Sequence, residues 1–409
     1  MPADRILRPR NEKDVVNAVR ATAEAGLTME VAGAGTKRGL GRPVTADVVC
    51  DLSALTGIML YEPEELVLTA KAGTPLAEIE RTLAASNQHL GFEPPYLGPL
   101  YGTDAETETI GGALACNLAG SRRMAAGAAR DHFLGLEVVT GYGELIKAGG
   151  RVVKNVTGYD VSKLFAGSYG TLGILTQVTV KVLPAPERQA TVVVTGLDDA
   201  EAIKLLRSAV TQPLEISGAV HLPEWAVADS AISEIRDIGA AVTAMRFEGF
   251  AVSVDNRVSR LTRVLSHRYA STTLSDDASK PFWADLRTLG PTIRRPHDHV
   301  WRISVPPACA ADVVKDIQGH IRADGWYDWG GGLIWCLVPA LGGVCAEPIR
   351  AAAEAAGGHA TLMRAPDAAR LETPVFHPLN EAKAALVGRI KASFDPDGMF
   401  NPGRMYAEG

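Results

Sequence analysis

Apolar residues recur along the chain with two spacings, one typical of helices and one typical of strands. Apolar positions after Asn11, a suitable N-cap, predict an amphipathic helix to Ala25 with Val15 and Val19 on its buried face. A second helix is predicted from Thr74-Pro75 to about Ser86, because proline is favoured at the first helical position. Apolar and β-branched runs predict strands at Thr28–Ala32, Val48–Leu52, Leu66–Ala72, Phe133–Thr140 and Ile174–Leu183.

The pattern changes after Pro184-Ala185-Pro186, the clearest boundary in the sequence. Beyond it, strands are predicted at Thr191–Thr195, Ser217–Leu222, Val300–Pro306, Leu333–Pro339 and His359–Arg364, alternating with helices at Asp198–Val210, Cys309–Arg322 and Glu347–Ala356. This alternation predicts an α+β domain with a mainly antiparallel sheet and helices on one face. No convincing tandem repeat is visible. A last predicted helix, Asn380–Phe394, leads into a turn-rich tail ending at Arg404.

Composition places the chain among globular proteins. Its 409 residues suffice for two or three domains, with 46% hydrophobic and 22% charged residues. The net charge of -6, without any block of like charges, argues against a nucleic-acid partner. The charged N-terminus lacks the apolar core of a secretory signal, and no apolar run reaches the roughly 18 residues of a membrane span. The sequence therefore predicts a cytoplasmic protein.

The cysteines and histidines do not favour a metal centre. The five cysteines are widely spaced and include no C-x-x-C pair, so the chain is expected to hold neither an iron–sulfur cluster nor a zinc ribbon. They are interpreted as reduced, mostly buried thiols. His297 and His299 form an H-x-H pair, but the charged context indicates an exposed loop, and a metal role is the less favoured interpretation.

Three glycine-rich segments carry the candidate chemistry. In the first, Ala32–Gly41, a predicted strand enters glycines whose backbone N–H groups could cradle a pyrophosphate. Arg38 occupies the place of the third glycine of a dinucleotide fingerprint, and no Gly-Lys-Ser/Thr follows, so neither standard phosphate loop is present. Taken alone, the segment fits a phosphate cradle and a structural turn equally well.

The second segment, Thr109–Gly120, closes a Pro- and Gly-rich stretch that begins at His89. Its paired glycines, Gly111 and Gly112, would let a short helix press its N-terminus against a ligand, and nearby arginines could offset diphosphate charge. A close-packed turn with its arginines in solvent is the alternative. The third segment, Lys154–Thr176, has four glycines and two tyrosines and runs into a predicted strand, which suits one wall of a large, partly apolar cofactor site.

In this order, the three segments resemble the FAD-binding domain of the vanillyl-alcohol oxidase/PCMH flavoprotein superfamily. The resemblance rests on Thr-x-Gly-Tyr-Asp followed by Gly-Ser-x-Gly-Thr-Leu-Gly-Ile, after an early glycine loop and a Thr-Ile-Gly-Gly segment. It covers about the first 185 residues and the terminal FNPGR, Phe400–Arg404. The chain is most similar to the branch with glycolate oxidase, D-lactate dehydrogenase and D-2-hydroxyglutarate dehydrogenase, and within it to FAD-binding subunits of bacterial glycolate oxidases.

The resemblance implies a two-part PCMH-type FAD-binding domain at residues 1–184, an α+β (ferredoxin-like) cap at 187–365 and a C-terminal segment, 366–409, that returns to the FAD domain. It implies pyrophosphate contacts from Ala32, Gly33, Ala34, Gly35, Thr36, Lys37 and Gly39. Diphosphate, ribityl and adenine contacts would come from Thr109, Gly111, Gly112, Ala113, Asn117, Arg130 and Asp131. Around the flavin it implies Thr157, Gly158, Gly167, Ser168, Gly170 and Ile174, with the tail residues Asn401 and Arg404 packed on this domain.

Three departures from the family pattern shape the expected function. Covalent members place a histidine in the early loop, where this chain has Thr36 and Lys37, so the FAD is predicted to be non-covalent. Catalytic hydroxyacid dehydrogenases of the branch carry a His-Gly-Asp-Gly-Asn-His-type segment that binds metal and substrate, whereas the nearest fragment here is Gly357-Gly358-His359. Tyr169 replaces the glutamate of their Gly-Ser-Glu-Gly. An intact flavin site with an incomplete substrate site and no metal is therefore expected.

Two functional hypotheses follow. In the first, the chain is an FAD-binding subunit of a glycolate oxidase that oxidises a 2-hydroxyacid such as glycolate or D-lactate. It would serve electron transfer or structural support beside a catalytic flavoprotein paralogue and an iron–sulfur subunit, which would also provide any contact with the inner face of the membrane. The six tryptophans, all after residue 224, mark the cap as the docking surface for these partners.

In the second hypothesis, the chain is a self-sufficient FAD-dependent 2-hydroxyacid dehydrogenase. Arg302 or Arg364 would hold the substrate carboxylate, and His359 or His377 would take the hydroxyl proton. Salt bridges and core packing are the favoured interpretations of these residues taken singly. A flavin-free scaffold that keeps only the fold is a third, weaker possibility.

Overall fold

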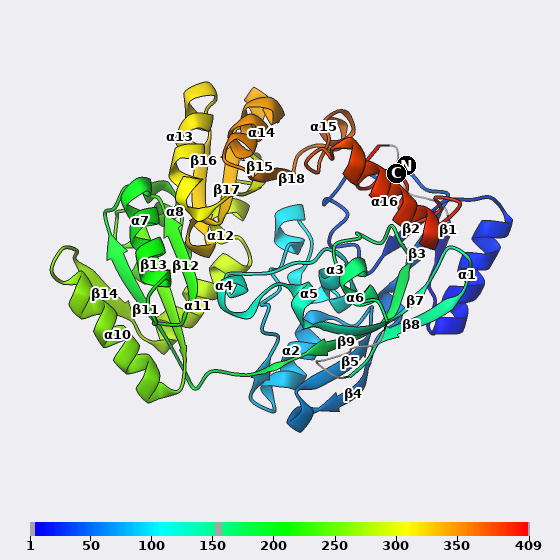
Figure 1. Cartoon of the computed structure of the whole chain (residues 1–409), viewed down its shortest axis with the longest axis horizontal. Helices are drawn as coiled ribbons and strands as arrows, with labels where there is room; N and C mark the ends of the chain where they lie inside the picture. The colour runs from blue at the N-terminus through cyan, green and yellow to red at the C-terminus, as the bar shows by residue number, and fades with distance from the viewer. Residues whose placement is uncertain (1–4, 152–157, 408–409) are drawn as a thin grey trace. The chain divides into compact units, whose positions relative to one another are not determined.

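A computed structural model describes residues 5–151 and 158–407, which form two compact units (Figure 1). Unit 1 comprises Met1–Leu118, Ala128–Pro184 and Arg370–Gly409, and unit 2 comprises Ala119–Gly127 and Ala185–Ala369. The short segment Ala119–Gly127 thus belongs to the second unit, although it lies in the first half of the sequence. The three-part division at residues 184 and 366 stays a prediction.

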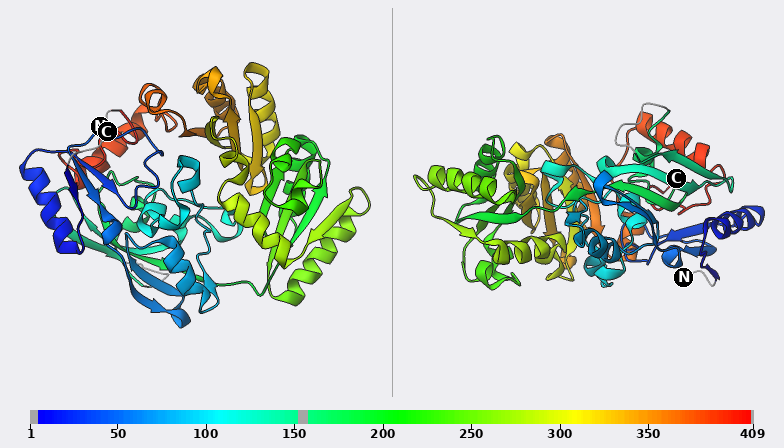
Figure 2. Two further views of the ribbon diagram at one scale, coloured as in Figure 1. Left: turned by 180° about the vertical axis from the view of Figure 1, so that it is seen from behind. Right: turned by 90° about the horizontal axis from the view of Figure 1, so that it is seen from below.

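Unit 1 contains a three-stranded parallel sheet. Its order is β1 (Arg5–Leu7), β3 (Val48–Asp51) and β2 (Met29–Ala32). Helix α1 (Glu12–Glu24) lies beside this sheet (Figure 2) and packs Val15 and Val19 into a core shared with Met29. The Asn11 side chain accepts a hydrogen bond from the Asp14 N–H and caps the helix, as its sequence predicts.

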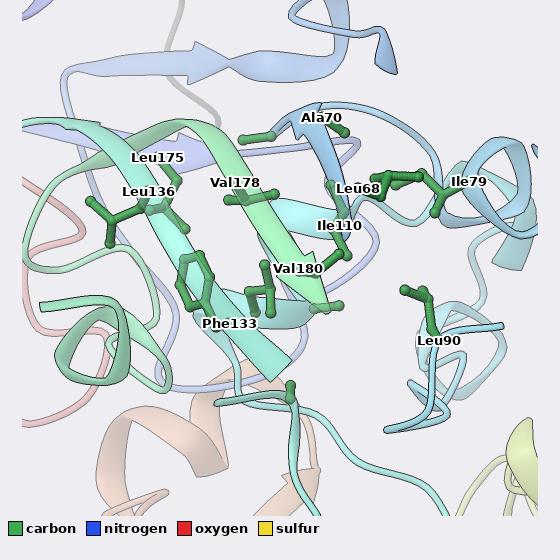
Figure 3. Packing of buried hydrophobic residues seen from close by; sticks show 14 of the residues in the cluster. Leu68, Ala70, Ile79, Leu90, Ile110, Phe133, Leu136, Leu175, Val178 and Val180 are labelled. Carbon is green, nitrogen blue, oxygen red and sulfur yellow. The ribbon is translucent and has the colours of Figure 1, made fainter. Parts of the chain in front are cut away.

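A five-stranded antiparallel sheet forms the larger part of unit 1. Its order is β4 (Ile58–Glu62), β5 (Val67–Lys71), β9 (Ile174–Lys181), β7 (Phe133–Val139) and β8 (Leu145–Gly149). Figure 3 shows the neighbouring strands β7 and β9 with Phe133, Val178 and Val180 in the core, which helices α2 (Leu76–Ala84) and α3 (Ile110–Ala115) complete. Strands β4 and β8 escaped the sequence analysis because their residues are half-buried or exposed and leave a weak apolar pattern.

The C-terminal segment of unit 1 returns to the three-stranded sheet. The Met29 N–H donates to the Met399 carbonyl at 2.9 Å, and the Asn401 N–H donates to the Met29 carbonyl at 2.9 Å. The Lys391 ammonium donates to the Thr171 carbonyl at 2.8 Å and to the carboxylate of Asp395 at 2.6 Å. Strand β6 (Gln88–His89) pairs with β10 (Leu183–Pro184). Unit 1 also contains helices α5 (Ala129–His132), α6 (Val161–Phe165) and α16 (Glu381–Phe394). Helix α15 (Asp367–Glu372) spans the boundary between the units at residue 370.

Unit 2 is built on an eight-stranded sheet in which every pair of neighbours is antiparallel, as predicted. The order is β14 (Ser271–Leu274), β11 (Arg188–Thr195), β13 (Val242–Gly249), β12 (Ile216–Leu222), β16 (Asp324–Asp328), β17 (Leu333–Val338), β15 (His299–Ser304) and β18 (His359–Arg364). The helices are α4 (Arg123–Ala126), α7 (Asp199–Val210), α8 (Glu224–Ala228), α9 (Ser233–Arg236), α10 (Ala251–Leu265), α11 (Asp276–Arg287), α12 (Gly290–Ile293), α13 (Ala310–His320) and α14 (Ala346–Ala355).

Two ferredoxin-like repeats make up this sheet. The first runs β11–α7–β12–β13–α10–β14 and the second β15–α13–β16–β17–α14–β18, and each has the spatial strand order fourth, first, third, second. They join through β12 and β16, where His221 lies opposite Tyr327. The repeat is invisible in the sequence because a core constrains size and polarity at each position, and many apolar residues satisfy that constraint.

The expectation that the helices cover only one face of this sheet is wrong, because helix α11 packs on the other face. Helices α7 and α10 pack on β11, β12 and β13 through one core cluster, which includes Val192 and Val194. Helix α11 instead meets Thr191, whose side chain points to the opposite face because successive strand residues alternate. The Trp283 indole donates to the Thr191 hydroxyl at 2.8 Å. In the first repeat, helix α11 therefore covers the second face of the sheet.

A buried ion-pair network holds Ala119–Gly127 within unit 2. Arg122 donates to both carboxylate oxygens of Glu248, at 3.0 and 2.6 Å, and Nε of Arg246 lies 3.3 Å from the same group. Burial alone would raise the pKa of Glu248, but the charge of Arg246 and the hydrogen bond from Arg122 outweigh it and hold the pKa far below its usual value of 4.5.

Glu248→Gln is expected to destabilise unit 2 by about 3 kcal/mol at pH 7, because two buried guanidinium groups lose their counter-charge. Because the pKa of Glu248 is depressed in the folded state, its ionised carboxylate stabilises the fold fully above pH 4.5. This contribution is lost as the pH falls below 4.5 toward the depressed pKa. The difference between wild type and variant should therefore shrink in acid. Urea unfolding at several pH values would measure it by tryptophan fluorescence, because all six tryptophans lie in unit 2. Glu215→Gln, at an exposed ion pair, is the matched control and should change little.

Candidate functional site

The three glycine-rich segments meet around one pocket of unit 1. The first contributes Ala32 to Arg38, the second Thr109, Gly111 and Gly112, and the third Ser168, Tyr169, Gly170 and Gly173. Apolar residues of the two sheets and their connections add Val31, Leu52, Ala72 and Leu175, and the wall is completed by Glu30, Ala115, Cys116 and Arg404. Segments more than 50 residues apart in sequence therefore form a single surface.

The loop after β2 presents a row of backbone donors to this pocket. Among the described residues, no acceptor lies within hydrogen-bond geometry of the N–H groups of residues 33–37. Thr36 and Lys37 are nevertheless buried, with 4% and 7% of their surface exposed. Buried backbone N–H groups nearly always have a partner, so the donors of Thr36 and Lys37, which follow the more exposed N–H groups of residues 33–35 along the same loop, favour an anionic ligand.

The short helix α3 brings its N-terminal residues to the pocket wall. Its first N–H groups already have protein acceptors: Ile110 donates to the Thr74 carbonyl at 3.0 Å, Gly111 to the Ala72 carbonyl at 2.9 Å and Gly112 to the Thr109 hydroxyl at 3.2 Å. The donors of the first turn are therefore already used within the protein, while Thr109, Gly111 and Gly112 still line the pocket, and contact of the helix N-terminus with a ligand stays a prediction. The helix contributes Gly111 and Gly112, which line the pocket without side chains.

Glycines make that closeness possible. A Cβ on Gly33 would lie 2.5 Å from Oγ1 of Thr109, and a Cβ on Gly111 would lie 2.7 Å from the Ala72 carbonyl oxygen. In the third segment Gly170 has φ +70°, and a Cβ there would lie 2.8 Å from Nδ2 of Asn401. The backbone at these three glycines therefore lies closer to its neighbours than a Cβ would allow, and a ligand can approach it equally closely. A flat dinucleotide cofactor fits such walls.

The pocket also contains a buried ion pair that the sequence analysis missed. The Lys37 ammonium donates to Glu108, and the two side chains are 8% and 0% exposed. The other carboxylate oxygen of Glu108 accepts the Gly98 N–H at 2.5 Å. An acidic residue directly before Thr-Ile-Gly-Gly was the available signal, but nothing local shows that it is buried. Burial raises the pKa of the neighbouring Cys116 thiol, which disfavours a reactive thiolate.

Several predicted contact residues do not line the pocket. Gly39 packs against Tyr101, the Asn117 side chain accepts the Arg130 N–H at 3.0 Å, and the Asp131 side chain accepts the Ala128 N–H at 2.8 Å. The same holds for Ala113, Gly158, Gly167, Ile174 and Asn401. Ile174 points into the core with Val15, because alternation along β9 turns Leu175 toward the pocket instead. Thr157 lies outside the described residues. The cofactor contacts of all these residues stay predictions.

Three of the candidate substrate residues lie in unit 2 and one lies in unit 1. In unit 2, Arg364 donates to the carbonyl oxygens of Asp298 and Arg295, and the Arg302 guanidinium lies 5.0 Å from the ring centre of Trp329. His359 is exposed at the start of β18, and His377, in unit 1, is half-buried. Burial lowers the pKa of His299. In the described part of the chain, no three histidine, cysteine or acidic side chains gather as metal ligands.

Comparisons with known proteins agree with the expected family. Residues 3–149 match the FAD binding domain family. The chain is 36% identical over 378 residues to the glycolate oxidase subunit GlcE of Escherichia coli (strain K12), a match that covers 92% of each chain. The glycolate oxidase subunit GlcD of Bacillus subtilis (strain 168) is 32% identical over 189 residues, which cover 46% of this chain and 38% of GlcD.

Solved structures show the same fold at much lower identity. A structure of p-cresol methylhydroxylase with substrate bound superimposes with a TM-score of 0.74 and 16% identity, covering 98% of this chain and 88% of that one. None of the helices in the described residues combines the length and apolar character needed to cross a membrane. The predicted α+β, PCMH-type fold and the FAD cofactor are confirmed. The chain belongs to the family of FAD-dependent oxidoreductases that includes the glycolate oxidase subunit GlcE.

Proposed function

We propose that this chain is an FAD-binding subunit of a multi-subunit glycolate oxidase and works beside a catalytic flavoprotein paralogue and an iron–sulfur subunit. The observation that carries the proposal is the 36% identity to GlcE along 92% of both chains. The related GlcD matches only over 46% of this chain, consistent with two paralogous flavoproteins in one complex. The substrate of the assembly would be glycolate or a similar small 2-hydroxyacid.

Residues of the pocket support binding of a dinucleotide. Backbone N–H groups of residues 33–37 would hold the diphosphate, and Gly33 and Gly112 would let the backbone approach it. Val31, Leu52, Ala72 and Leu175 exclude water from the apolar part of the pocket. When bound, FAD supplies the group that accepts and passes on electrons, while the protein fixes its position and surroundings.

The side chains of unit 2 favour an electron-transfer or structural role over independent turnover. A substrate carboxylate needs a guanidinium with free donors, and two of the three guanidinium nitrogens of Arg364, Nε and Nη2, already donate to two backbone carbonyls. Arg302 stacks on Trp329, and its proposed partner base His359 lies exposed at the end of a strand. Arg302 and His359 lie on one face of the paired strands β15 and β18, but these engaged or exposed side chains support the electron-transfer or structural role better than a substrate site.

The purified chain, reconstituted with FAD, tests this proposal. We expect a yellow protein that releases all its flavin on denaturation, as non-covalent binding requires. Under anaerobic conditions neither glycolate nor D-lactate should bleach the flavin absorbance of the isolated chain within minutes. Bleaching should appear when the co-expressed paralogue and iron–sulfur subunit are added. Rapid bleaching of the isolated chain would instead establish a self-sufficient dehydrogenase, and a colourless chain after reconstitution would establish a flavin-free scaffold.

A further inference from the structure

One cation of the pocket lacks a counter-charge in the described part of the chain. Four charged side chains line the pocket: Glu30, Lys37, Arg38 and Arg404. Lys37 pairs with Glu108, and Arg38 pairs with Glu30 through hydrogen bonds of 2.7 and 3.1 Å. Within the described residues, no carboxylate forms an ion pair with Arg404. Lys37 and Arg38 are therefore paired. Glu30 favours the charge of Arg404 as well, but its ion pair is with Arg38, so Arg404 supplies the net positive charge of the pocket.

The Arg404 side chain is also buried. Only 7% of its surface is exposed, and its Nη2 donates to the Lys37 carbonyl at 2.8 Å. Burial lowers the pKa of Arg404, because the charged form has lost hydration that the protein does not fully replace. Buried charges are normally paired, so an uncompensated guanidinium beside the loop N–H groups of residues 33–37 indicates that an anion completes the site.

The tail holds Arg404 in place without any ligand. The Arg404 N–H donates to the Asn401 carbonyl at 3.1 Å, and its own carbonyl accepts the Arg42 N–H at 2.8 Å. The Asn401 side chain accepts the Val31 N–H and donates to the Tyr169 carbonyl, both at 2.8 Å, and so ties the tail to the pocket wall. The guanidinium is thus preorganised, and a ligand that meets it spends little conformational entropy on ordering the side chain.

We propose that Arg404 is the charge that binds the anionic diphosphate of the dinucleotide, while Lys37, neutralised by Glu108, mainly maintains the loop. This inference rests on the proposed FAD binding. It gives the FNPGR tail a role in binding the ligand, in addition to its packing on unit 1. The guanidinium can offer two parallel N–H donors to phosphate oxygens, which an ammonium cannot. The diphosphate is the group of FAD that is negatively charged in the oxidised state, so oxidised FAD is the appropriate probe.

Arg404→Met tests the proposal through two readouts of opposite sign. We expect the affinity for oxidised FAD, measured by flavin fluorescence, to fall roughly 10- to 100-fold, because a charged hydrogen-bonding group is lost. The unfolding midpoint of the FAD-free protein should stay the same or rise, because an uncompensated buried charge is removed. Arg404→Lys should recover part of the affinity. In wild type, added salt should weaken FAD binding more than it does in Arg404→Met.

Arg370→Met is the matched control, since this buried guanidinium donates to the Gly41 carbonyl at 2.5 Å but does not line the pocket. It should leave FAD affinity within about two-fold. An Arg404→Met protein that binds FAD like wild type would overturn the inference. So would one whose FAD-free form is destabilised in parallel with the loss of affinity, because that pattern indicates a structural role. If wild type itself does not bind FAD, the proposed function fails first, which separates the two outcomes.

Discussion

Replacing Lys37 with methionine is expected to destabilise unit 1 by about 3–5 kcal/mol, because it leaves the Glu108 carboxylate buried without a cation. Both side chains are almost completely buried, at 8% and 0% exposure, so solvent cannot replace the lost partner. Urea unfolding followed by far-UV circular dichroism would measure the loss. Tryptophan fluorescence, which reports on unit 2 alone, provides an internal reference that should not shift.

The double variant Lys37→Met/Glu108→Gln should recover most of this stability. Removing both charges abolishes the unpaired carboxylate, and the glutamine oxygen can still accept the Gly98 N–H. Arg38→Met is the matched control in the same loop, since its side chain is 51% exposed and its ion pair is screened by water. It should change stability little. Equal losses in the single and double variants would show that the pair itself does not maintain the loop.

Asn401→Asp is expected to destabilise unit 1 by about 3 kcal/mol or more at pH 7. The Asn401 side chain is 1% exposed and donates to the carbonyl oxygens of Tyr169 and Gly170, at 2.8 and 3.3 Å. In the variant, a carboxylate oxygen would face both carbonyls, and the Val31 N–H would remain as a donor to the buried negative charge. The connection between the tail, β2 and the pocket wall should weaken as a result.

The pH dependence identifies this mechanism. Burial raises the pKa of a carboxyl group, so the carboxyl introduced by Asn401→Asp would be destabilising above its raised pKa. The variant would recover stability as the pH falls through that value and the group becomes protonated. Thermal unfolding between pH 5 and pH 8, followed by circular dichroism, should therefore show the deficit of the variant shrinking toward pH 5. Asn380→Asp, at the exposed N-cap of α16, keeps a good cap and should match wild type at every pH. A deficit independent of pH would contradict this account.

The glycine segments were the part of the site that the sequence could predict. Gly33 and Gly170 are needed where a neighbouring side chain, and Gly111 where a neighbouring backbone carbonyl, lies too close for a Cβ, so a larger residue would require a shift. The Ile174 side chain packs in the core, so any contact of this residue with the flavin would come from its backbone and stays a prediction. The Asp131 side chain caps helix α5 by accepting the Ala128 N–H. This structural role explains the aspartate without any ligand.

The sequence by itself determined the helices and strands with strong apolar periodicity, the mainly antiparallel sheet after Pro184 and the order of the three glycine segments, because each depends on local spacing. Only the tertiary structure decided which charges are compensated. Glu108 meets Lys37 from 71 residues away, and Arg404 reaches the same loop across 367 residues. Burial and pairing arise where distant segments pack together, and no local pattern encodes them. The pairing of the two ferredoxin-like repeats through β12 and β16 could not be predicted from the sequence either, because it also depends on the packing of distant segments.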